Sequence, residues 1–590
     1  MTLNSETKVE RLVIIQSSVQ SQHYKNSCRK ESDLILAIGP EAMYEAETNS
    51  WKYCCLGEIW SDDQYELNKK KNEKCVNELI IGLNNYSRSR DLSKNLEIGN
   101  YYAFQLCVII GQILNNIFIV NSIIKNLGPE NLLCYTKSNP ELFLEHRPDP
   151  DSILANVLCR ILANKKVQFD LISLPEFDSN VTRREKILTF LPSSIRFFLV
   201  KFRDCFRFKK IKSAKHNLLL IGAGGDWVKL AKYSSFNNFF TLVPAKKYKT
   251  TGTIKPSQEV IDLLESSIKY KNIIPYDMYN LAALIQEDTE VFASLADDID
   301  QMLNKHDAVV TAVLTYPWDN FLAHRAALKN MPVIVWQHGE KGQSDLDITS
   351  IYTEIFYATD YFAYAPLVVN QYKSLIGKYR LKNVVAIGSI GKQVEWEGGD
   401  TILYATGKWF KTTNPFVSDP DSRLFKAHIK ILPLLEKYTD LYKVIFKANN
   451  TPKLNNTPYQ FKNIKIEYEK SFTECLKTAK LVILDTPATT LIEACSTNIP
   501  IFCLGGRSEY TNEFLAAVKQ RVVWSETPED LIINLKNFLD SEVYPADIHN
   551  KQLLTLFGSG AVPSQIAESS RNSIINSLNR HCKKKEVNIL

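Results

Sequence analysis

The sequence predicts an α/β protein in which two facing α/β units follow a third, N-terminal one. Strand-like apolar runs alternate with helical runs almost throughout, which is the pattern of parallel sheets covered by helices. The chain has 590 residues, too many for one hydrophobic core, and the usual size of a domain predicts three units. The glycine pair in WEGGD, residues 396–400, predicts a hinge between the last two units because glycine bends easily.

The first unit is expected over residues 1–178. Its strand-like runs are RLVIIQ, DLILAIG, NLLCYT and VQFDLISL. The apolar run 104–124 is long enough to cross a membrane, but five amides interrupt it: Gln105, Gln112, Asn115, Asn116 and Asn121. Polar side chains are costly in lipid, so we expect a buried helix there.

Residues 179–215 form a connecting segment in which basic and aromatic side chains interleave, as in RFFLVKFRDCFRFKKIK. Such a segment can lie in an anionic membrane interface, where each basic residue contributes on the order of 1 kcal/mol. A core helix followed by a solvated basic loop explains the same residues equally well. A lipid acceptor would favour the membrane.

The second and third units are expected over residues 216–395 and 396–590. The second has the strand-like runs NLLLIGAGG, FFTLVPA, AVVTAVLTY, PVIVWQHGE, YFAYAP and NVVAIGSIG. The third has TILYATG, YKVIFKAN, IKIEYE, LVILDTP, IPIFCLGG and QRVVWS. Two such units joined by a hinge form a cleft at the carboxyl ends of their strands.

Composition and charge exclude several classes of protein. With 45% hydrophobic and 23% charged residues, the composition is that of a globular protein. The net charge of +6 is modest and no aromatic-basic repeat points to nucleic acid, so none is expected as a partner. The twelve cysteines include no CxxC pair and predict reduced core residues of a cytosolic protein. The N-terminus lacks an export-signal pattern, so we expect no export.

The most informative stretch is 481–506, LVILDTPATTLIEACSTNIPIFCLGG, with the order strand, hydroxyl-rich turn, helix and strand. This order places Thr486, Thr489 and Thr490 where a strand ends and a helix begins. Unpaired amides and the helix dipole favour an anion there, so we predict a phosphate or nucleotide site. The alternative is that the threonines only cap the helix.

Two further turns of the third unit are expected at the same sheet edge. Gly407 and Lys408 follow its first strand, and Lys447 and Asn449 follow its second. The lysines would supply charge to a phosphate, and Glu493 on the helix would accept hydrogen bonds from a ribose or base. Taken singly, each is better explained as a surface lysine or a charge on a helix surface, and it is their joint placement that favours a nucleotide site.

Candidate acid–base residues end two strands of the second unit. His338 and Glu340 follow PVIVWQ, beside Gly339, and imidazole side chains titrate near neutrality. Asp319, after AVVTAVLTY, is a second candidate base. The alternatives are a histidine held in a structural turn and an aspartate that caps a helix.

Several motifs are absent from the sequence. IGAGGDW at 221–227 lacks the full GxGxxG pattern, and there is no GxxxxGKS/T, HExxH or convincing DxD pair. We therefore expect neither a metal site nor a bound cofactor.

With these turns in place, residues 216–560 resemble the two Rossmann-like halves of GT-B glycosyltransferases. DTPATTLIEACSTNIPIFCLGG is similar to their donor-binding half. WQHGE, followed by YFAYAP and VVAIGSIG, resembles the end of the acceptor half in bacterial surface-carbohydrate enzymes, which include Kdo and sialic-acid transferases and polyol-phosphate transferases. The sialyltransferase-like members carry a His-Pro pair where this chain has Ala448, Asn449 and Asn450, and paired serines where it has Thr489 and Thr490.

The resemblance implies a metal-independent glycosyltransferase of lipopolysaccharide, O-antigen or capsule synthesis. A nucleotide sugar, such as a CMP-linked one, would be the donor and a glycan or lipid-linked glycan the acceptor. His338 or Asp319 would be the base, oriented by Glu340. The donor residues would be Gly407, Lys408, Lys447, Asn449, Thr486, Thr489, Thr490 and Glu493. The protein would be cytoplasmic, or peripheral on the inner face of the cytoplasmic membrane.

Three alternatives fit the same residues. A polyol-phosphate transferase of the CDP-glycerol type would form a phosphodiester. A nucleotide-sugar epimerase would need no acceptor. A non-catalytic scaffold of an assembly complex would bind no nucleotide.

Overall fold

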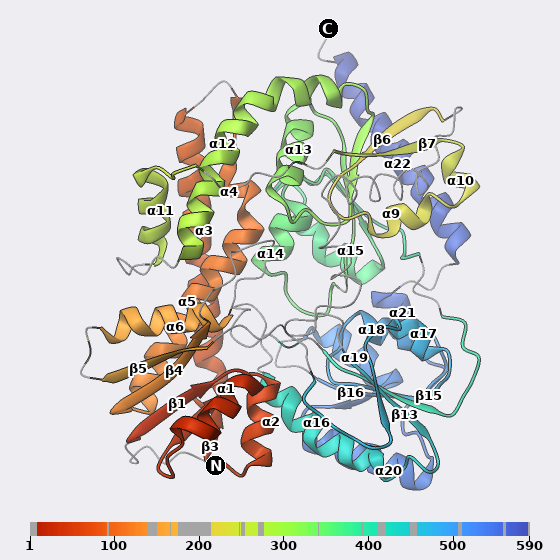
Figure 1. Cartoon of the computed structure of the whole chain (residues 1–590). Coiled ribbons are helices and arrows are strands. Elements are labelled where there is room, and N and C mark those ends of the chain that lie inside the picture. The colour runs from red at the N-terminus through yellow and green to blue at the C-terminus, as the bar shows by residue number, and fades with distance from the viewer. Residues whose placement is uncertain are drawn as a thin grey trace, which may run out of the picture.

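The chain folds into three parallel sheets, each covered by helices (Figure 1). The computed structural model describes residues 9–90, 94–137, 150–163, 165, 167–174, 214–246, 248, 254–268, 276–339, 341–390, 394–407, 409, 421–448, 457–505, 510–558 and 562–587. The predicted α/β class is confirmed. Most of the predicted connecting segment 179–215 lies outside the described residues.

The N-terminal sheet has the strand order β3-β2-β1-β4-β5. Its strands are β1 (Arg11–Ile15), β2 (Leu34–Ala37), β3 (Tyr53–Cys55), β4 (Asn131–Lys137) and β5 (Gln168–Leu174). Its helices are α1 (Ser18–His23), η1 (Tyr24–Cys28), α2 (Pro40–Thr48), η2 (Leu56–Glu58), α3 (Asp62–Arg90), α4 (Ile98–Tyr101), α5 (Ala103–Asn126) and α6 (Pro150–Leu162). Leu12 and Ile14 of β1 enter one core and Val13 and Ile15 another, so both faces of the sheet are covered.

The middle sheet has the strand order β11-β10-β9-β8-β6-β7. Its strands are β6 (His216–Leu220), β7 (Phe240–Pro244), β8 (Ala308–Thr311), β9 (Val333–Trp336), β10 (Asp360–Ala363) and β11 (Asn383–Ala386). Its helices are α9 (Gly225–Leu230), α10 (Ser234–Asn237), α11 (Gln258–Ile268), α12 (Tyr276–Leu303), α13 (Pro317–Leu328), α14 (Ile348–Ser350), η4 (Ile351–Ile355) and α15 (Pro366–Lys373).

The C-terminal sheet has the strand order β14-β13-β12-β15-β16-β17. Its strands are β12 (Thr401–Ala405), β13 (Lys443–Lys447), β14 (Ile464–Glu467), β15 (Ala479–Leu484), β16 (Ile501–Leu504) and β17 (Val523–Ser525). The helices that follow in sequence are α16 (Asp421–Glu436), α17 (Phe472–Leu476), α18 (Thr489–Cys495), α19 (Asn512–Arg521), α20 (Pro528–Ser541), α21 (Gln552–Phe557) and α22 (Pro563–Val587).

In each sheet the chain reverses its direction of travel across the sheet at one place. The reversal falls between β1 and β4, between β6 and β8, and between β12 and β15. In open α/β sheets, ligands bind outside the carboxyl ends of the strands at such a reversal. These three places are therefore the candidate ligand sites of the fold.

The N-terminal unit packs against both of the others (Figure 1). Residues of α3 and α5 share one hydrophobic core with Leu281 of α12 and Phe321 of α13. On the other face of the N-terminal sheet, Met43 of α2 shares a core with Phe425 of α16. The units that the sequence separates are thus joined through common cores.

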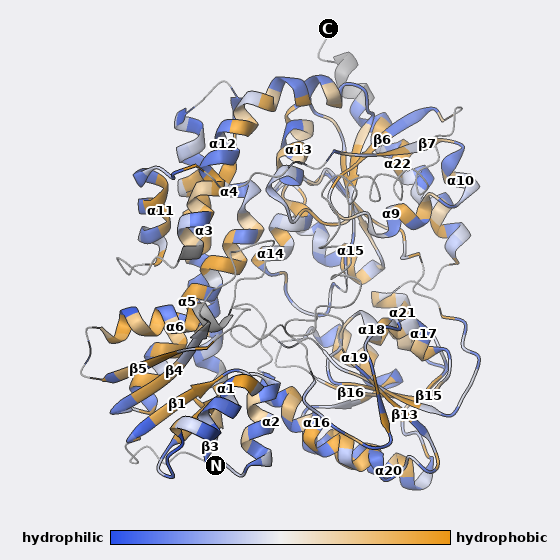
Figure 2. Ribbon diagram, in the orientation of Figure 1, coloured by the Kyte–Doolittle hydropathy of each residue, from blue (hydrophilic) through white to orange (hydrophobic). Residues whose placement is uncertain are grey.

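The apolar helix predicted over 104–124 is α5, and it is buried in the protein. Within the described part of the chain, it is the one helix long and apolar enough to cross a membrane, and 78% of its most apolar window is buried. Figure 2 shows this helix beside the hydrophobic strands of the N-terminal sheet. The prediction of a core helix is confirmed.

The last helix, α22, packs on the middle sheet although the sequence places it after the third unit. Ile566 and Ile574 enter the core that holds Trp336 and Phe362. The buried carboxylate of Asp360 accepts a hydrogen bond from the Ser577 hydroxyl at 2.7 Å and pairs with Arg580. This differs from the predicted grouping of the C-terminal helices with residues 396–590, because an amphipathic pattern does not specify which sheet it covers.

A buried histidine joins the N-terminal and middle units and makes stability depend on pH. His324 of α13 lies with its Nδ1 2.6 Å from the Tyr101 hydroxyl and its ring stacked on Tyr357. Burial lowers the pKa of His324 from 6.5 to about 4. The unfolded chain therefore binds an extra proton between these values, and the free energy of unfolding falls as the pH falls through this window.

We expect the free energy of unfolding to lose roughly 3 kcal/mol from this histidine between pH 6.5 and pH 4. Urea titrations across this range measure the loss. His324→Gln removes the titrating group, so its curve should be flatter over the same window. Curves of equal slope for both proteins would contradict the assignment.

Candidate functional site

The carboxyl edges of the middle and C-terminal sheets meet. The loop after β9 reaches the segment that follows β16, where Ser344 bridges Tyr510. The Thr511 amide donates to the Gln343 carbonyl at 2.8 Å. Residues that come after the ends of strands in two different sheets are therefore in direct contact, and the two reversal points lie at the same carboxyl edges as these loops.

The reversal point of the C-terminal sheet is built around Gly407 and Asp485. Gly407 follows β12, Asp485 follows β15, and the Gly407 amide donates to Asp485 Oδ1 at 2.6 Å. A Cβ atom added to Gly407 would lie 2.5 Å from the Thr486 hydroxyl oxygen and 3.2 Å from the Thr486 Cβ. Only glycine allows the two turns to approach this closely, which explains the residue that the sequence singled out.

The sequence reasoning missed two residues at this point, Asp485 and His428. Both side chains are fully buried, and His428 Nε2 lies 2.6 Å from Asp485 Oδ2. An ionised carboxylate only accepts hydrogen bonds, so Nε2 is the donor. Asp485 could have been predicted from the sequence, because it directly follows a buried strand. His428 had none, because it lies on α16, more than 50 residues upstream.

Of the three predicted threonines, Thr489 and Thr490 begin α18 and Thr486 lies in the loop before it. The N-cap of this helix is Ala488, whose side chain makes no capping hydrogen bond. Thr489 and Thr490 are the first helical residues and are half-buried. The alternative in which one of them is the N-cap is therefore wrong, while Thr486 contacts the Gly407 turn from the preceding loop.

The other predicted donor residues are placed in different ways. Lys447 directs its ammonium at three backbone carbonyls, those of Ala448, Glu467 and Tyr468, at 2.9 to 3.3 Å. Burial lowers its pKa. Its donors are engaged within the protein, so it holds two strand ends together. Glu493 accepts from the Thr473 hydroxyl of α17 at 3.2 Å.

Lys408 and Asn449 lie outside the described residues. Their predicted roles stay predictions.

Asp319 lies at the reversal point of the middle sheet. It is the third residue of α13, whose N-cap is Tyr316, so Asp319 is not the cap. Its carboxylate is close to Gly222, where an added Cβ would be 3.5 Å from Asp319 Oδ2. Gly222 has φ of 59°, and its turn bridges Val313 through Ala223. The glycine-rich run thus brings the turn after β6 to the candidate base.

His338 is exposed on the turn after β9, one strand away from that reversal point. The turn is fixed by Gln337, which donates to the Gly339 carbonyl at 2.9 Å and accepts from the Tyr364 amide at 2.8 Å. Gly339 has φ of 72°. A rigid turn therefore presents the imidazole to solvent at the edge that meets the C-terminal unit. Glu340 lies outside the described residues.

Within the described part of the chain, no group of three His, Cys, Asp or Glu side chains is arranged to hold a metal ion.

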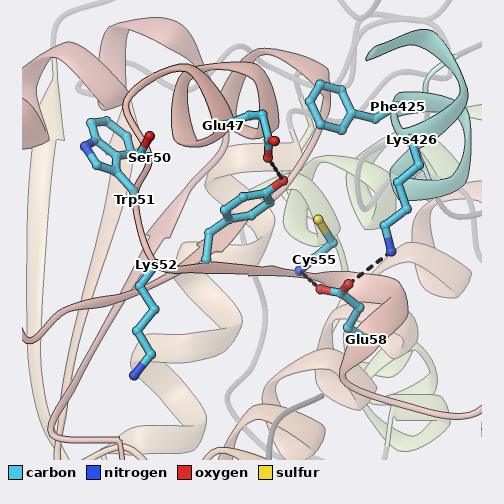
Figure 3. Close-up of a pocket in the computed structure, with 9 residues that line it drawn as sticks. Glu47, Ser50, Trp51, Lys52, Cys55, Glu58, Phe425 and Lys426 are labelled. Carbon is cyan, nitrogen blue, oxygen red and sulfur yellow. Dashed lines mark hydrogen bonds and ion pairs between the residues drawn. The ribbon is translucent and has the colours of Figure 1, made fainter. Parts of the chain in front are cut away.

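A cavity of about 460 Å³ lies between β3 and α16, away from these turns (Figure 3). Its carboxylates are paired within the protein. Glu47 accepts from the Tyr53 hydroxyl at 2.6 Å, and Glu58 pairs with Lys426 at 3.0 Å. None of the reversal-point residues lines it, and it marks the joint between the N-terminal and C-terminal units.

Comparison with known proteins gives similarity in structure only. No protein-family model matches the chain, and no curated protein matches it. Among solved structures, MurG of Acinetobacter baumannii is similar at 12% identity, covering 62% of this chain and 99% of its own, with a TM-score of 0.30. The glycosyltransferase SnogD of Streptomyces nogalater is similar at 11% identity, covering 61% of this chain and 100% of its own, with a TM-score of 0.34. The spinosyn forosaminyltransferase SpnP is similar at 12% identity, covering 62% of this chain and 96% of its own, with a TM-score of 0.31. At such values the residues of this chain must carry the functional argument.

We expect Gly407→Ala to destabilise the protein by roughly 1–3 kcal/mol, because the new methyl group overlaps Thr486 and forces the two turns apart. Urea denaturation measures the change. Gly82→Ala is the control, since its added Cβ meets only a Leu263 methyl group at 3.1 Å. Equal stability of Gly407→Ala and the unmodified chain would contradict the close approach.

Proposed function

We propose that this chain is a glycosyltransferase of the GT-B type that uses a nucleotide sugar as donor. The observation that carries the proposal is the contact between loops from the carboxyl edges of two parallel sheets, with hydroxyl groups at the reversal point of one sheet and a carboxylate at that of the other. Open α/β sheets bind nucleotides at such points. The acceptor would lie on the middle sheet and the donor on the C-terminal sheet.

The donor phosphates would bind at Thr486, Thr489 and Thr490. Hydroxyl groups and backbone amides that follow a strand suit phosphate oxygens, and they would stabilise the charge that grows on the leaving phosphate without a metal ion. Gly407 leaves room for the Thr486 turn to approach the turn after β12 closely. Lys408, Asn449 and Glu493 remain part of the proposed donor site. Lys447 would act indirectly, by holding the end of β13.

The acceptor hydroxyl would be deprotonated by Asp319 or His338, with Glu340 orienting the base. The alkoxide oxygen then bonds to the anomeric carbon while the bond from that carbon to the nucleotide phosphate breaks. Asp319 is buried beside the Gly222 turn, whereas His338 is exposed on the next strand end. General base catalysis typically contributes 10²- to 10⁴-fold in rate.

The proposed acceptor is a glycan or lipid-linked glycan of lipopolysaccharide, O-antigen or capsule synthesis. The resemblance of WQHGE and its following strands to bacterial surface-carbohydrate enzymes supports this choice. Such a chain would work in the cytoplasm or on the inner face of the cytoplasmic membrane, where the basic segment 179–215 would contact anionic lipid.

We expect one nucleotide among CMP, UDP, GDP and CDP to raise the melting temperature, because a ligand that binds only the folded state stabilises it by about 2.7 kcal/mol at one hundred times its Kd. A thermal-shift screen identifies it. In calorimetry, the Thr489→Ala, Thr490→Ala double variant should bind that nucleotide about tenfold more weakly, from the loss of hydroxyl hydrogen bonds. Unchanged affinity would remove the threonines from the site, and no response to any nucleotide would favour a scaffold.

We expect His338→Ala or Asp319→Asn, whichever removes the base, to lower transfer about 10²- to 10⁴-fold with nucleotide affinity retained. Product analysis by mass spectrometry separates a glycosidic product from a phosphodiester or an epimerised sugar. Circular dichroism confirms that each variant is folded. Full turnover by both variants would exclude both residues as the base.

A further inference from the structure

The buried pair of His428 and Asp485 couples two turns of the proposed donor site. Asp485 uses one oxygen for His428 Nε2 and the other for the Gly407 amide, each at 2.6 Å. The Thr486 hydroxyl lies 3.4 Å from the same Oδ1. Burying a carboxylate costs several kcal/mol unless such partners compensate it. The orientation of this one carboxylate therefore fixes the turn after β12 relative to the turn after β15.

The imidazole ring of His428 is held in one orientation by its surroundings. Four aromatic rings meet it nearly edge-on, with centroids 5.1 to 5.5 Å away: Tyr404, Trp409, Phe446 and Tyr459. Its Nδ1 lies 3.1 Å from the Tyr459 hydroxyl. The Thr406 hydroxyl oxygen lies 3.2 Å from Nε2. A ring enclosed in this way keeps Nε2 directed at Asp485.

The pair of His428 and Asp485 does more than fill space, because it also orients the Asp485 carboxylate. Two apolar residues in place of both His428 and Asp485 would fill this space with no buried charge, and such replacements of a whole pair are often as stable as the buried polar pair. What the pair adds is the direction of the carboxylate. Among the described residues, that direction bears on the Gly407 amide and the neighbouring Thr486 hydroxyl.

We infer that His428 is a positioning residue for the nucleotide donor: through Asp485, it holds the Gly407 turn against the Thr486 turn in the arrangement that binds the donor phosphates. This inference rests on the proposed function. The side chain of His428 has no exposed surface, so it would not touch the donor. Its effect is therefore on affinity for the nucleotide, exerted through a residue 57 positions later in the sequence.

The test compares nucleotide binding in three variants of the full chain by calorimetry. The probe is whichever of CMP, UDP, GDP and CDP stabilises the unmodified chain. His428→Leu removes the hydrogen bond to a charged group and should raise the Kd about ten- to a hundredfold. His428→Gln offers an amide N–H to Asp485 and should restore affinity to within about threefold of the unmodified chain.

Tyr544→Phe is the matched control for general loss of stability. Its hydroxyl donates to the carbonyls of Ile501 and Arg521 inside the same unit, at 3.0 and 2.7 Å. It should lower the melting temperature without changing the Kd. If His428→Leu does not fold, Asp485→Asn takes its place with the same expected rise in Kd.

Two outcomes separate the inference from the function on which it rests. If the unmodified chain binds no nucleotide, the proposed function is wrong and the inference falls with it. If the unmodified chain binds and His428→Leu binds equally well, or if His428→Gln is as weak as His428→Leu, then His428 has no specific positioning role and only the inference is overturned.

Discussion

The covering of both faces of every sheet is the constraint on which this structure depends. Parallel sheets expose apolar side chains on both faces, so each needs helices on two sides. The N-terminal sheet meets this need with α3, α5 and α6 on one face and with α2 and α16 near the other. The middle sheet meets it with α22, from the far end of the chain. Helix α16 is thus in one core with both the N-terminal and the C-terminal sheet.

Within this frame, glycine and buried charge shape the candidate site. Gly407 and Gly222 each stand where a side chain would strike the opposite turn. The buried carboxyl group of Asp485 has hydrogen-bond partners on both of its oxygens. Lys447 was predicted to bind a phosphate, but its ammonium group donates hydrogen bonds to backbone carbonyls instead. Lys447 thus stabilises the fold, and the hydroxyl groups of the threonines are left at the edge of the sheet.

The strands and turns of the candidate site could be predicted from the sequence, whereas contacts between distant elements could not. Buried parallel strands read as continuous apolar runs, so LVIL and the turn after it were found, and with them Gly407 and Thr486. The partner of Asp485 was not found, because a histidine on a distant helix gains its meaning only from tertiary contact. The docking of α22 on the middle sheet was missed for a related reason: its apolar stripe fits any sheet equally well, and the choice is made by Asp360 meeting Ser577 and Arg580.

The N-terminal unit has a mechanical consequence for the hinge predicted at 396–400. Tyr44 of α2 rests edge-on against Tyr459, 5.6 Å between ring centres, while α3 and α5 are embedded beside α12 and α13. A body fixed to both arms of a hinge acts as a strut. Opening the two arms would require the strut to detach at one end, and the joint beside Tyr44 is the one that contains the 460 Å³ cavity. Any motion about the predicted hinge would thereby depend on the packing of a unit that takes no part in the proposed chemistry.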